Sequence, residues 1–312
     1  MNLSPYKLFY KKFCSCKGEF ISHAAGMELN MKLKQPGAEL FIPDNLTVEE
    51  GIARTTHMGI SAHQDDIEIM AYHGVMECFG KEDQWFFATI LTDGAGSPRD
   101  DLYANYSDED MKQVRKKEQK KAAYVGEYGA LALMNYPSKA VKDPNNEDVI
   151  NELAELIAHA KPKVVYTHNL ADKHDTHVGT SVKVIKAIRR LPAEQRPEKL
   201  FGCEVWRCLD WINDNEKVLF DVASHQNISA AILEVHDSQI CGGKRYDLAT
   251  AGRRLANATY AESHGTDNTT ALTYAMDLTP LIQDESLDII SYVEGFIERF
   301  KEDVYNRVKK MA

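Results

Sequence analysis

The sequence predicts an α/β fold built on a doubly wound, mostly parallel sheet, with a β/α addition at its C-terminal end. Short apolar runs alternate with longer segments of helical periodicity from about residue 58 to residue 190, and this alternation favours βαβ units. Beyond Pro197 the order changes, because two strand-like runs precede two helix-like segments. We therefore expect a Rossmann-like sheet with helices on both faces, extended by a differently ordered region.

The expected strands are short and rich in apolar residues, as buried strands of parallel sheets are. Met58 to Ala62 is the first such run. Trp85 to Leu91 is the second, and it ends at the turn-forming pair Asp93-Gly94. The other expected strands cover residues 130–134, 163–167, 201–209 and 218–222.

The expected helices lack proline and carry apolar residues at helical spacing. In residues 149–160, for example, Ile150, Leu153 and Ile157 form one apolar stripe. The other expected helices cover residues 67–79, 111–127, 177–190, 224–239, 245–261 and 287–308.

The domain organisation follows from where this alternation begins. Residues 1–50 contain proline and glycine at intervals and show no clear amphipathic period, so we expect an N-terminal extension there. Residues 51–312 are expected to form one domain, with a core from about residue 58 to 200 and an addition from 201 to 312. A chain of 312 residues is long enough for one large α/β domain.

The bulk properties exclude several classes of partner. A net charge of −10 does not suit binding to a nucleic-acid backbone. No apolar run approaches the roughly 18 residues that cross a membrane, and the first 20 residues contain no apolar stretch of the signal-peptide type. We therefore expect a cytoplasmic protein. Its six cysteines do not form paired C-x-x-C motifs, so reduced thiols are expected.

Polar residues with metal-binding side chains follow two of the expected strands. His63, Asp65 and Asp66 come directly after the first strand, and His174 and His177 come after the strand at residues 163–167. The carboxyl ends of parallel strands meet at one edge of a sheet, which is where ligands bind in such folds. We therefore expect these two groups, which are far apart in sequence, to form one site. The turn at residues 93–94 follows the second strand and belongs to the same edge.

Two histidines and a carboxylate suit a catalytic zinc site, which keeps three protein ligands and one open position. His63, Asp66 and His177 are the predicted ligands, and Asp65 is the predicted base for a water that the metal activates. His174 is predicted to donate to an oxyanion or to protonate a leaving amine. Zn²⁺ is the expected metal, although Fe²⁺ suits such a ligand set in principle.

The same segments resemble the LmbE-like or PIG-L family, whose members are zinc-dependent and remove acetyl groups from N-acetylglucosamine units. The first family motif, A-H-P-D-D, is similar to residues 62–66, where Gln64 replaces the proline. The second, roughly T-x-N-P-x-D-x-H-P-D-H, is similar to residues 167–177, where Thr176 replaces an aspartate that often orients the preceding histidine. The resemblance is clear from about residue 58 to 184 and patchy to about residue 239.

The resemblance implies the same roles that the residue types suggest. By this likeness His63, Asp66 and His177 would bind zinc, Asp65 would be the general base, and His174 would stabilise the tetrahedral intermediate.

Shorter matches imply further residues of the site. Arg115 lies in a segment similar to the family's R-x-x-E helix, whose arginine faces the substrate, and Asp93 lies in a turn similar to the family's turn after the second strand. We therefore expect both residues to contact the substrate. Residues 236–239 are similar to a late H-x-S-Q segment. Ser138 lies where the family often has an aspartate that holds sugar hydroxyls.

These observations predict a zinc-dependent hydrolase that removes an acetyl group from an N-acetylated amino sugar or glycoside. One alternative is an amidase acting on a non-sugar amide or a thiol conjugate. Another is a metal-bearing binding protein without turnover. This alternative stays open because Thr176 replaces the aspartate that often orients the preceding histidine in the family. The expected partners are a small-molecule substrate and further copies of the chain in a homo-oligomer. Neither a nucleic acid nor a membrane is expected as a partner.

Overall fold

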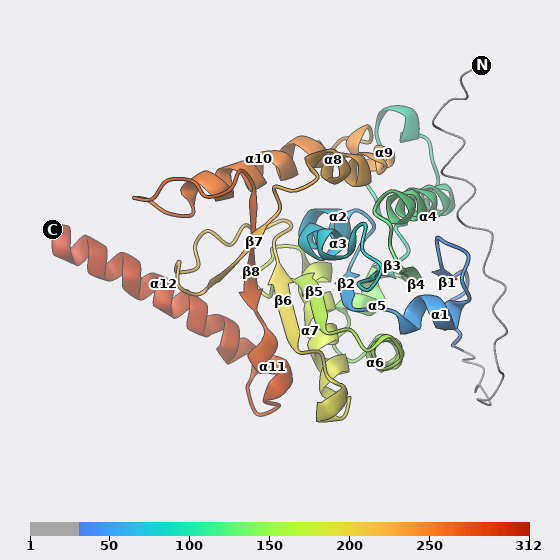
Figure 1. The fold of residues 1–312 in the computed structure, drawn as a ribbon, viewed down its shortest axis with the longest axis horizontal. Coiled ribbons are helices and arrows are strands. Elements are labelled where there is room, and N and C mark those ends of the chain that lie inside the picture. Colours follow the sequence, from blue (N-terminus) through green and yellow to red (C-terminus); the bar gives the residue numbers. More distant parts are fainter. Residues whose placement is uncertain (1–30) are drawn as a thin grey trace, which may run out of the picture. The chain divides into compact units, whose positions relative to one another are not determined.

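The computed structural model describes residues 31–312, which contain an eight-stranded sheet in the order β1-β4-β3-β2-β5-β6-β8-β7 (Figure 1). The strands are β1 (Glu39–Phe41), β2 (His57–Ser61), β3 (Phe86–Thr92), β4 (Ala130–Tyr136), β5 (Val164–His168), β6 (Lys199–Cys203), β7 (Lys217–Asp221) and β8 (Leu272–Asp277).

The five central strands run parallel, and the outer strands run antiparallel to their neighbours. Strand β2 pairs with β3 on one side and with β5 on the other, so the strand order reverses at β2. Strands β4 and β6 continue the parallel sheet on either side, whereas β1, β8 and β7 are antiparallel. The predicted fold class, a doubly wound and mostly parallel sheet with a C-terminal addition, is confirmed. Its reversal point at β2 is the expected place for a ligand.

Helices cover both faces of the sheet; α2, α3, α4 and α8 lie on one side in Figure 1, and α6 and α7 on the other. The α-helices are α1 (Val48–Ala53), α2 (Asp66–Met70), α3 (Tyr72–Cys78), α4 (Asp108–Val125), α5 (Ser138–Lys142), α6 (Glu147–Ala160), α7 (Asp175–Arg189), α8 (Gln226–Glu234), α9 (Asp237–Ile240), α10 (Tyr246–Tyr260), α11 (Thr279–Gln283) and α12 (Ile289–Met311).

The core lies between the sheet and these two helical layers. Every residue of β3 is buried, as expected for a parallel strand with helices on both faces. Within residues 31–312, no helix combines the length and the apolar character needed to cross a membrane.

Several expected elements differ from the observed ones. The helix expected at residues 67–79 is two helices, because the chain leaves helical geometry at Ala71. The helix expected at residues 224–239 likewise divides into α8 and α9. The strand expected at residues 201–209 ends at Cys203, and β8 was not expected at all.

Part of the segment expected to be an N-terminal extension joins the sheet. Strand β1, which lies inside the segment expected to be an extension, pairs antiparallel with β4 and forms one edge of the sheet. Its three residues are too few to show a period in the sequence. The beginning of the expected extension, residues 1–30, lies outside the described residues.

Candidate metal centre

Two loops at the carboxyl edge of the sheet carry the predicted metal ligands. Strand β2 ends at Ser61, and the next residues lead into α2 with His63 and Asp66. Strand β5, the neighbour of β2, ends at His168, and the following loop leads into α7 with His177 in its first turn. The parallel pairing of β2 and β5 therefore brings the two segments together, as the sequence predicts.

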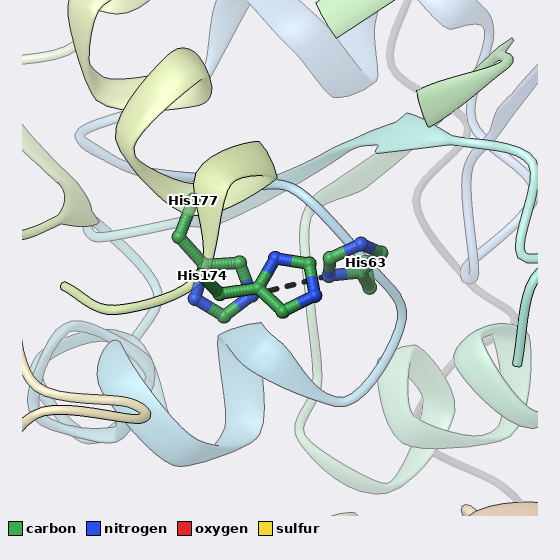
Figure 2. A group of neighbouring side chains, drawn as sticks. All are labelled: His63, His174 and His177. Atoms are coloured by element: carbon green, nitrogen blue, oxygen red, sulfur yellow. Dashed lines mark hydrogen bonds between the residues drawn. The ribbon is translucent and has the colours of Figure 1, made fainter. Parts of the chain in front are cut away.

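Three potential ligand atoms form a small triangle in this crevice. His63 Nδ1 lies 3.2 Å from His177 Nε2 and 3.2 Å from Asp66 Oδ2, and His177 Nε2 lies 3.4 Å from Asp66 Oδ2. Figure 2 shows the rings of His63 and His177 directed toward each other, with His174 beside them. A tetrahedral zinc with bonds of about 2.0–2.1 Å separates its ligand atoms by roughly 3.3–3.4 Å. The residues predicted as ligands therefore fit one such ion.

The Asp66 carboxylate is held in its ionised form by its surroundings. Burial favours the neutral acid, but His177, His168 and a hydrogen bond with His63 outweigh burial, so the pKa of Asp66 lies well below its ordinary value. The backbone amide of His63 also donates to Asp66 Oδ2 at 2.8 Å. Asp66 is thus a charged and oriented group, as a metal ligand must be.

The His177 ring is neutral and has a carboxylate on its far side. Burial lowers the pKa of His177 to about 4, so the neutral ring, with one nitrogen lone pair, dominates at neutral pH. On the far side of the ring, Nδ1 lies 3.6 Å from Asp172 Oδ2. A carboxylate behind a histidine ligand is a common arrangement around bound zinc, because it fixes the tautomer and raises the basicity of the ligand.

Asp172 also holds the loop between β5 and α7. Its Oδ1 accepts the backbone amide of His174 at 3.0 Å, and its Oδ2 accepts the amide of Trp206 at 3.1 Å. Asp172 therefore anchors the backbone of His174 and places a carboxylate behind the His177 ring.

Replacing Asp172 with asparagine should weaken metal binding by about 10–100-fold, the usual effect of removing such a partner of a histidine ligand. Titration of the metal-free protein with Zn²⁺ would measure this change. The matched control is Asp175→Asn, which alters an exposed carboxylate three residues away and should leave the affinity unchanged. Equal affinities of the Asp172→Asn variant and the native protein would contradict this role for Asp172.

His168 is the main residue of this site that the sequence did not reveal. Its ring stacks on that of His177, with centroids 3.8 Å apart, and its Nε2 accepts the backbone amide of Ala62 at 2.9 Å. Within residues 31–312, two overlapping groups could hold a metal by proximity: His63 with His174 and His177, and Asp66 with His168 and His177. Because the amide of Ala62 occupies the Nε2 lone pair, we regard His168 as a support for the β2 loop. Its position at the end of an expected strand was the only signal in the sequence.

Asp65 stands beside the triangle in a conformation that few residues adopt. Its φ of 79° lies in the left-handed region, which costs of the order of 1–3 kcal/mol for residues other than glycine. Arg115 Nη2 donates to Asp65 Oδ2 at 2.9 Å and also to the carbonyl oxygen of Gln64. Burial raises the pKa of Asp65, while Arg115 acts in the opposite direction. A carboxylate with a raised pKa in a cavity is suited to accept a proton.

Arg115 and Asp93, the two predicted substrate contacts, have different positions. Arg115 is buried on α4, pairs with Asp65 and borders the cavity, so it can act on the substrate directly or through Asp65. The Asp93 carboxylate accepts the amide of Ala95 at 3.1 Å and lies 3.4 Å from Lys112 Nζ. Asp93 is not among the cavity-lining residues, so its role in substrate binding stays a prediction.

His174 lies at the start of α7 and reaches the cavity. Its ring centroid is 4.6 Å from that of His177 and 5.0 Å from that of His63. Burial and the nearby His63 lower the pKa of His174, so the neutral ring dominates at neutral pH. Within the described chain, His174 Nδ1 has no hydrogen-bond partner, and Thr176 lines the cavity near it.

The late H-x-S-Q segment packs beside this site through two buried glutamates. Glu68 on α2 faces His236 Nε2 at 3.2 Å, and Glu118 on α4 accepts the amide and the hydroxyl of Ser238, each at 2.7 Å. Gln239 then lines the cavity. Glu118 is the glutamate of the R-x-x-E match, whereas no pattern in the sequence pointed to Glu68.

The site opens into a cavity of about 380 Å³. Its walls include the aromatic side chains of Trp206 and Tyr246, which meet edge to face with centroids 6.0 Å apart. Lys142 and Lys244 are exposed lining residues, and Lys244 Nζ lies 5.3 Å from the centre of the Trp206 ring. The cavity thus joins a polar end, which carries the candidate metal ligands, to an aromatic wall with positive charge nearby, and its size suits a small molecule.

Comparison with known proteins identifies a family for the segment that builds this site. Residues 58–188 match the model of the PIG-L family, described as GlcNAc-PI de-N-acetylase. This confirms the family resemblance inferred from the motifs. The matched segment includes all the predicted catalytic and metal-binding residues. No curated protein matches the sequence.

Solved structures share the fold at low sequence identity. An N,N'-diacetylchitobiose deacetylase from Pyrococcus horikoshii has a TM-score of 0.58 and 15% identity, with 74% of this chain and 86% of that chain covered. A conserved protein from Thermus thermophilus has a TM-score of 0.55 and 16% identity, with coverages of 74% and 98%. The 4-carboxy-2-hydroxymuconate hydratase GalB from Pseudomonas putida has a TM-score of 0.56 and 14% identity, with coverages of 72% and 95%. Because a deacetylase and a hydratase both appear, these likenesses establish the fold and leave the reaction to be argued from the site.

Proposed function

We propose that this chain, whose residues 58–188 belong to the PIG-L family, is a metal-dependent hydrolase that removes the acetyl group from an N-acetylated amino sugar or glycoside. The observation that carries the proposal is the triangle of His63 Nδ1, Asp66 Oδ2 and His177 Nε2, with edges of 3.2–3.4 Å, at one end of a substrate-sized cavity. Such a ligand set suits Zn²⁺ and is also compatible with Fe²⁺.

A bound Zn²⁺ would supply Lewis acidity, which acidifies water and polarises a carbonyl group. The chain itself contributes the proton acceptor, because Asp65 borders the cavity and is not one of the three ligands. Arg115 fixes the Asp65 carboxylate by an ion pair at 2.9 Å. Asp65 would take a proton from water as it attacks the acetyl carbonyl, and would later deliver a proton to the leaving amine.

His174 would stabilise the acetyl carbonyl oxygen, which becomes negatively charged when water attacks. Its ring lies beside those of His63 and His177 and borders the cavity. A neutral imidazole can donate one hydrogen bond, and preorganised donors of this kind stabilise a developing oxyanion. Within residues 31–312, no carboxylate accepts a hydrogen bond from His174 Nδ1, so we expect this ring to act as a hydrogen-bond donor more than as a strong acid.

Three features support a sugar as the substrate. Trp206 and Tyr246 offer the cavity flat aromatic surfaces, against which the apolar face of a sugar ring can pack. Ser138, at the place of the family's sugar-binding aspartate, also lines the cavity and carries a hydroxyl group. The family description and one related structure both name deacetylation of N-acetylglucosamine derivatives.

The test is acetate release from a panel of N-acetyl sugars and N-acetyl non-sugar amides, with metal-free protein and with protein reloaded with Zn²⁺ or Fe²⁺. We expect acetate and a free amino sugar in equal amounts, and only with metal present. Turnover of non-sugar amides alone would favour the amidase. Metal binding without acetate release from any amide would favour a binding protein.

A further inference from the structure

The C-terminal helix α12 carries an apolar stripe that the rest of the described chain leaves exposed. Its first half packs on the domain, where Phe296 is buried and the Tyr292 hydroxyl donates to the carbonyl oxygen of Asp277 at 2.6 Å. Its second half extends away from the sheet, as the red helix in Figure 1 shows. The exposed fractions along the stripe are Ile290 66%, Ile297 47%, Phe300 39%, Val304 43%, Val308 61% and Met311 80%.

Apart from Phe300, the apolar residues are spaced symmetrically about the middle of the helix. Phe300 instead meets the ring of Trp211 edge to face, with centroids 6.2 Å apart. Together with Val293, the stripe advances by three and then four residues before Ile297, and by four and then three residues after Val304. Steps of three and four keep side chains on one face of a helix. A pattern that reads the same in both directions matches a second copy of itself in the antiparallel orientation, as a two-fold symmetric interface requires.

The charges on α12 point to the same orientation. Residues 289–303 carry four carboxylates and two cationic side chains, whereas residues 304–312 carry three cationic side chains and no acidic one. An antiparallel pair sets the acidic half of each helix against the basic half of the other, while a parallel pair sets like charges together.

We propose that α12 binds α12 of a second copy of this chain as an antiparallel pair. In the register that places Ile297 against Val304, Ile290 meets Met311 and Glu294 meets Arg307. The like-charged Glu298 and Asp303 also face each other near the two-fold axis. Each of these carboxylates has a cationic neighbour on its own helix, which offsets their repulsion. Lys301 Nζ lies 2.9 Å from Glu298 Oε2, and Arg307 Nε lies 2.8 Å from Asp303 Oδ2. The stripe from residue 290 to 311 is about 33 Å long at 1.5 Å per residue.

Sedimentation of the full chain over a range of concentrations tests the proposal. The native protein should dimerise, and Val304→Lys should weaken dimerisation by roughly a hundredfold, because each dimer would bury two unpaired ammonium groups. The matched control is Asn306→Lys, which adds the same side chain on the opposite face of the helix and should leave dimerisation unchanged. Both variants lie in the half of α12 that projects from the domain, so folding should be retained.

A charge exchange tests the orientation. A variant with Arg307→Glu, and another with Glu294→Lys, should each dimerise weakly alone, because each sets two like charges against each other. Their mixture should form heterodimers. If each charge variant dimerises as well as the native chain, or if the mixture fails to pair, the antiparallel arrangement is wrong.

Three other outcomes would overturn the interface itself. These are a native chain that stays monomeric at all concentrations, a dimer that Val304→Lys does not weaken, and equal loss with Asn306→Lys. A monomeric chain that sediments with lipid vesicles would instead make the stripe a membrane contact. The acetate assay does not depend on any of these outcomes, so the interface and the enzymatic activity can fail separately.

Discussion

Replacing Asp65 with asparagine should lower acetate release by roughly 10²–10⁴-fold, the usual contribution of a general base, while the metal content stays the same. Asparagine has nearly the same shape and can still accept the hydrogen bond that Arg115 donates at 2.9 Å. It cannot take a proton from water. The ligand triangle does not include Asp65, so metal bound per chain should equal that of the native protein. Metal analysis and the acetate assay on the same preparation would measure both quantities.

The matched control for this variant is again Asp175→Asn. It removes the same charge from an exposed position one residue from His174 and should keep acetate release close to the native rate. Native activity of the Asp65→Asn variant would show that another group is the base. Loss of both metal and activity would instead place Asp65 among the ligands.

The sequence predicted those parts of the fold that rest on local patterns. Strands β2, β3, β4 and β5 are short apolar runs between helix-forming segments, so their places in the chain and their parallel direction followed from alternation alone. Strand β8 was missed because it lies between β6 and β7 through antiparallel pairing with both, and distant pairing of this kind leaves little trace in one segment. Strand β1 was also missed because it pairs with a distant strand, β4, and because its three residues are too few to show a period.

The candidate site was predictable where residue type and position at a strand end coincide. His63 and His177 were identified because each follows an expected strand, and the structure places their ring nitrogens 3.2 Å apart. The supporting residues were harder to find. His168 and Asp172 act through contacts with Ala62 and with the far side of the His177 ring, and such contacts depend on packing between loops.

The aromatic wall of the cavity was not predictable. Trp206 follows β6 in a stretch that we expected to be strand, and Tyr246 opens α10, about 40 residues later. Only the folding of the C-terminal region over the carboxyl edge of the sheet brings both to the cavity. Under the proposed function, substrate selection would therefore depend partly on residues beyond the family match at 58–188, where sequence motifs were fewest.

Replacing His177 with alanine should remove most of the bound metal and, with it, the activity. The variant deletes one corner of the triangle and leaves His63 and Asp66, and two ligands bind zinc far more weakly than three. We expect the affinity for Zn²⁺ to fall by more than roughly 100-fold. Loss of a group that only supports a ligand costs up to about that factor, and loss of the ligand itself should cost more. Metal analysis after dialysis, together with a Zn²⁺ titration, would measure this loss.

The loss must be separated from misfolding, because His177 is fully buried and stacks on His168. His177→Asn keeps more of the side-chain volume and should lose the metal while retaining the circular dichroism spectrum of the metal-free native protein. His159→Ala, which removes an exposed histidine on α6, should keep its metal. If folded His177→Asn and His177→Ala proteins both hold one metal per chain, His177 is not a ligand. In that case His168, whose Nε2 lies 3.4 Å from Asp66 Oδ2, would be the next ligand to test.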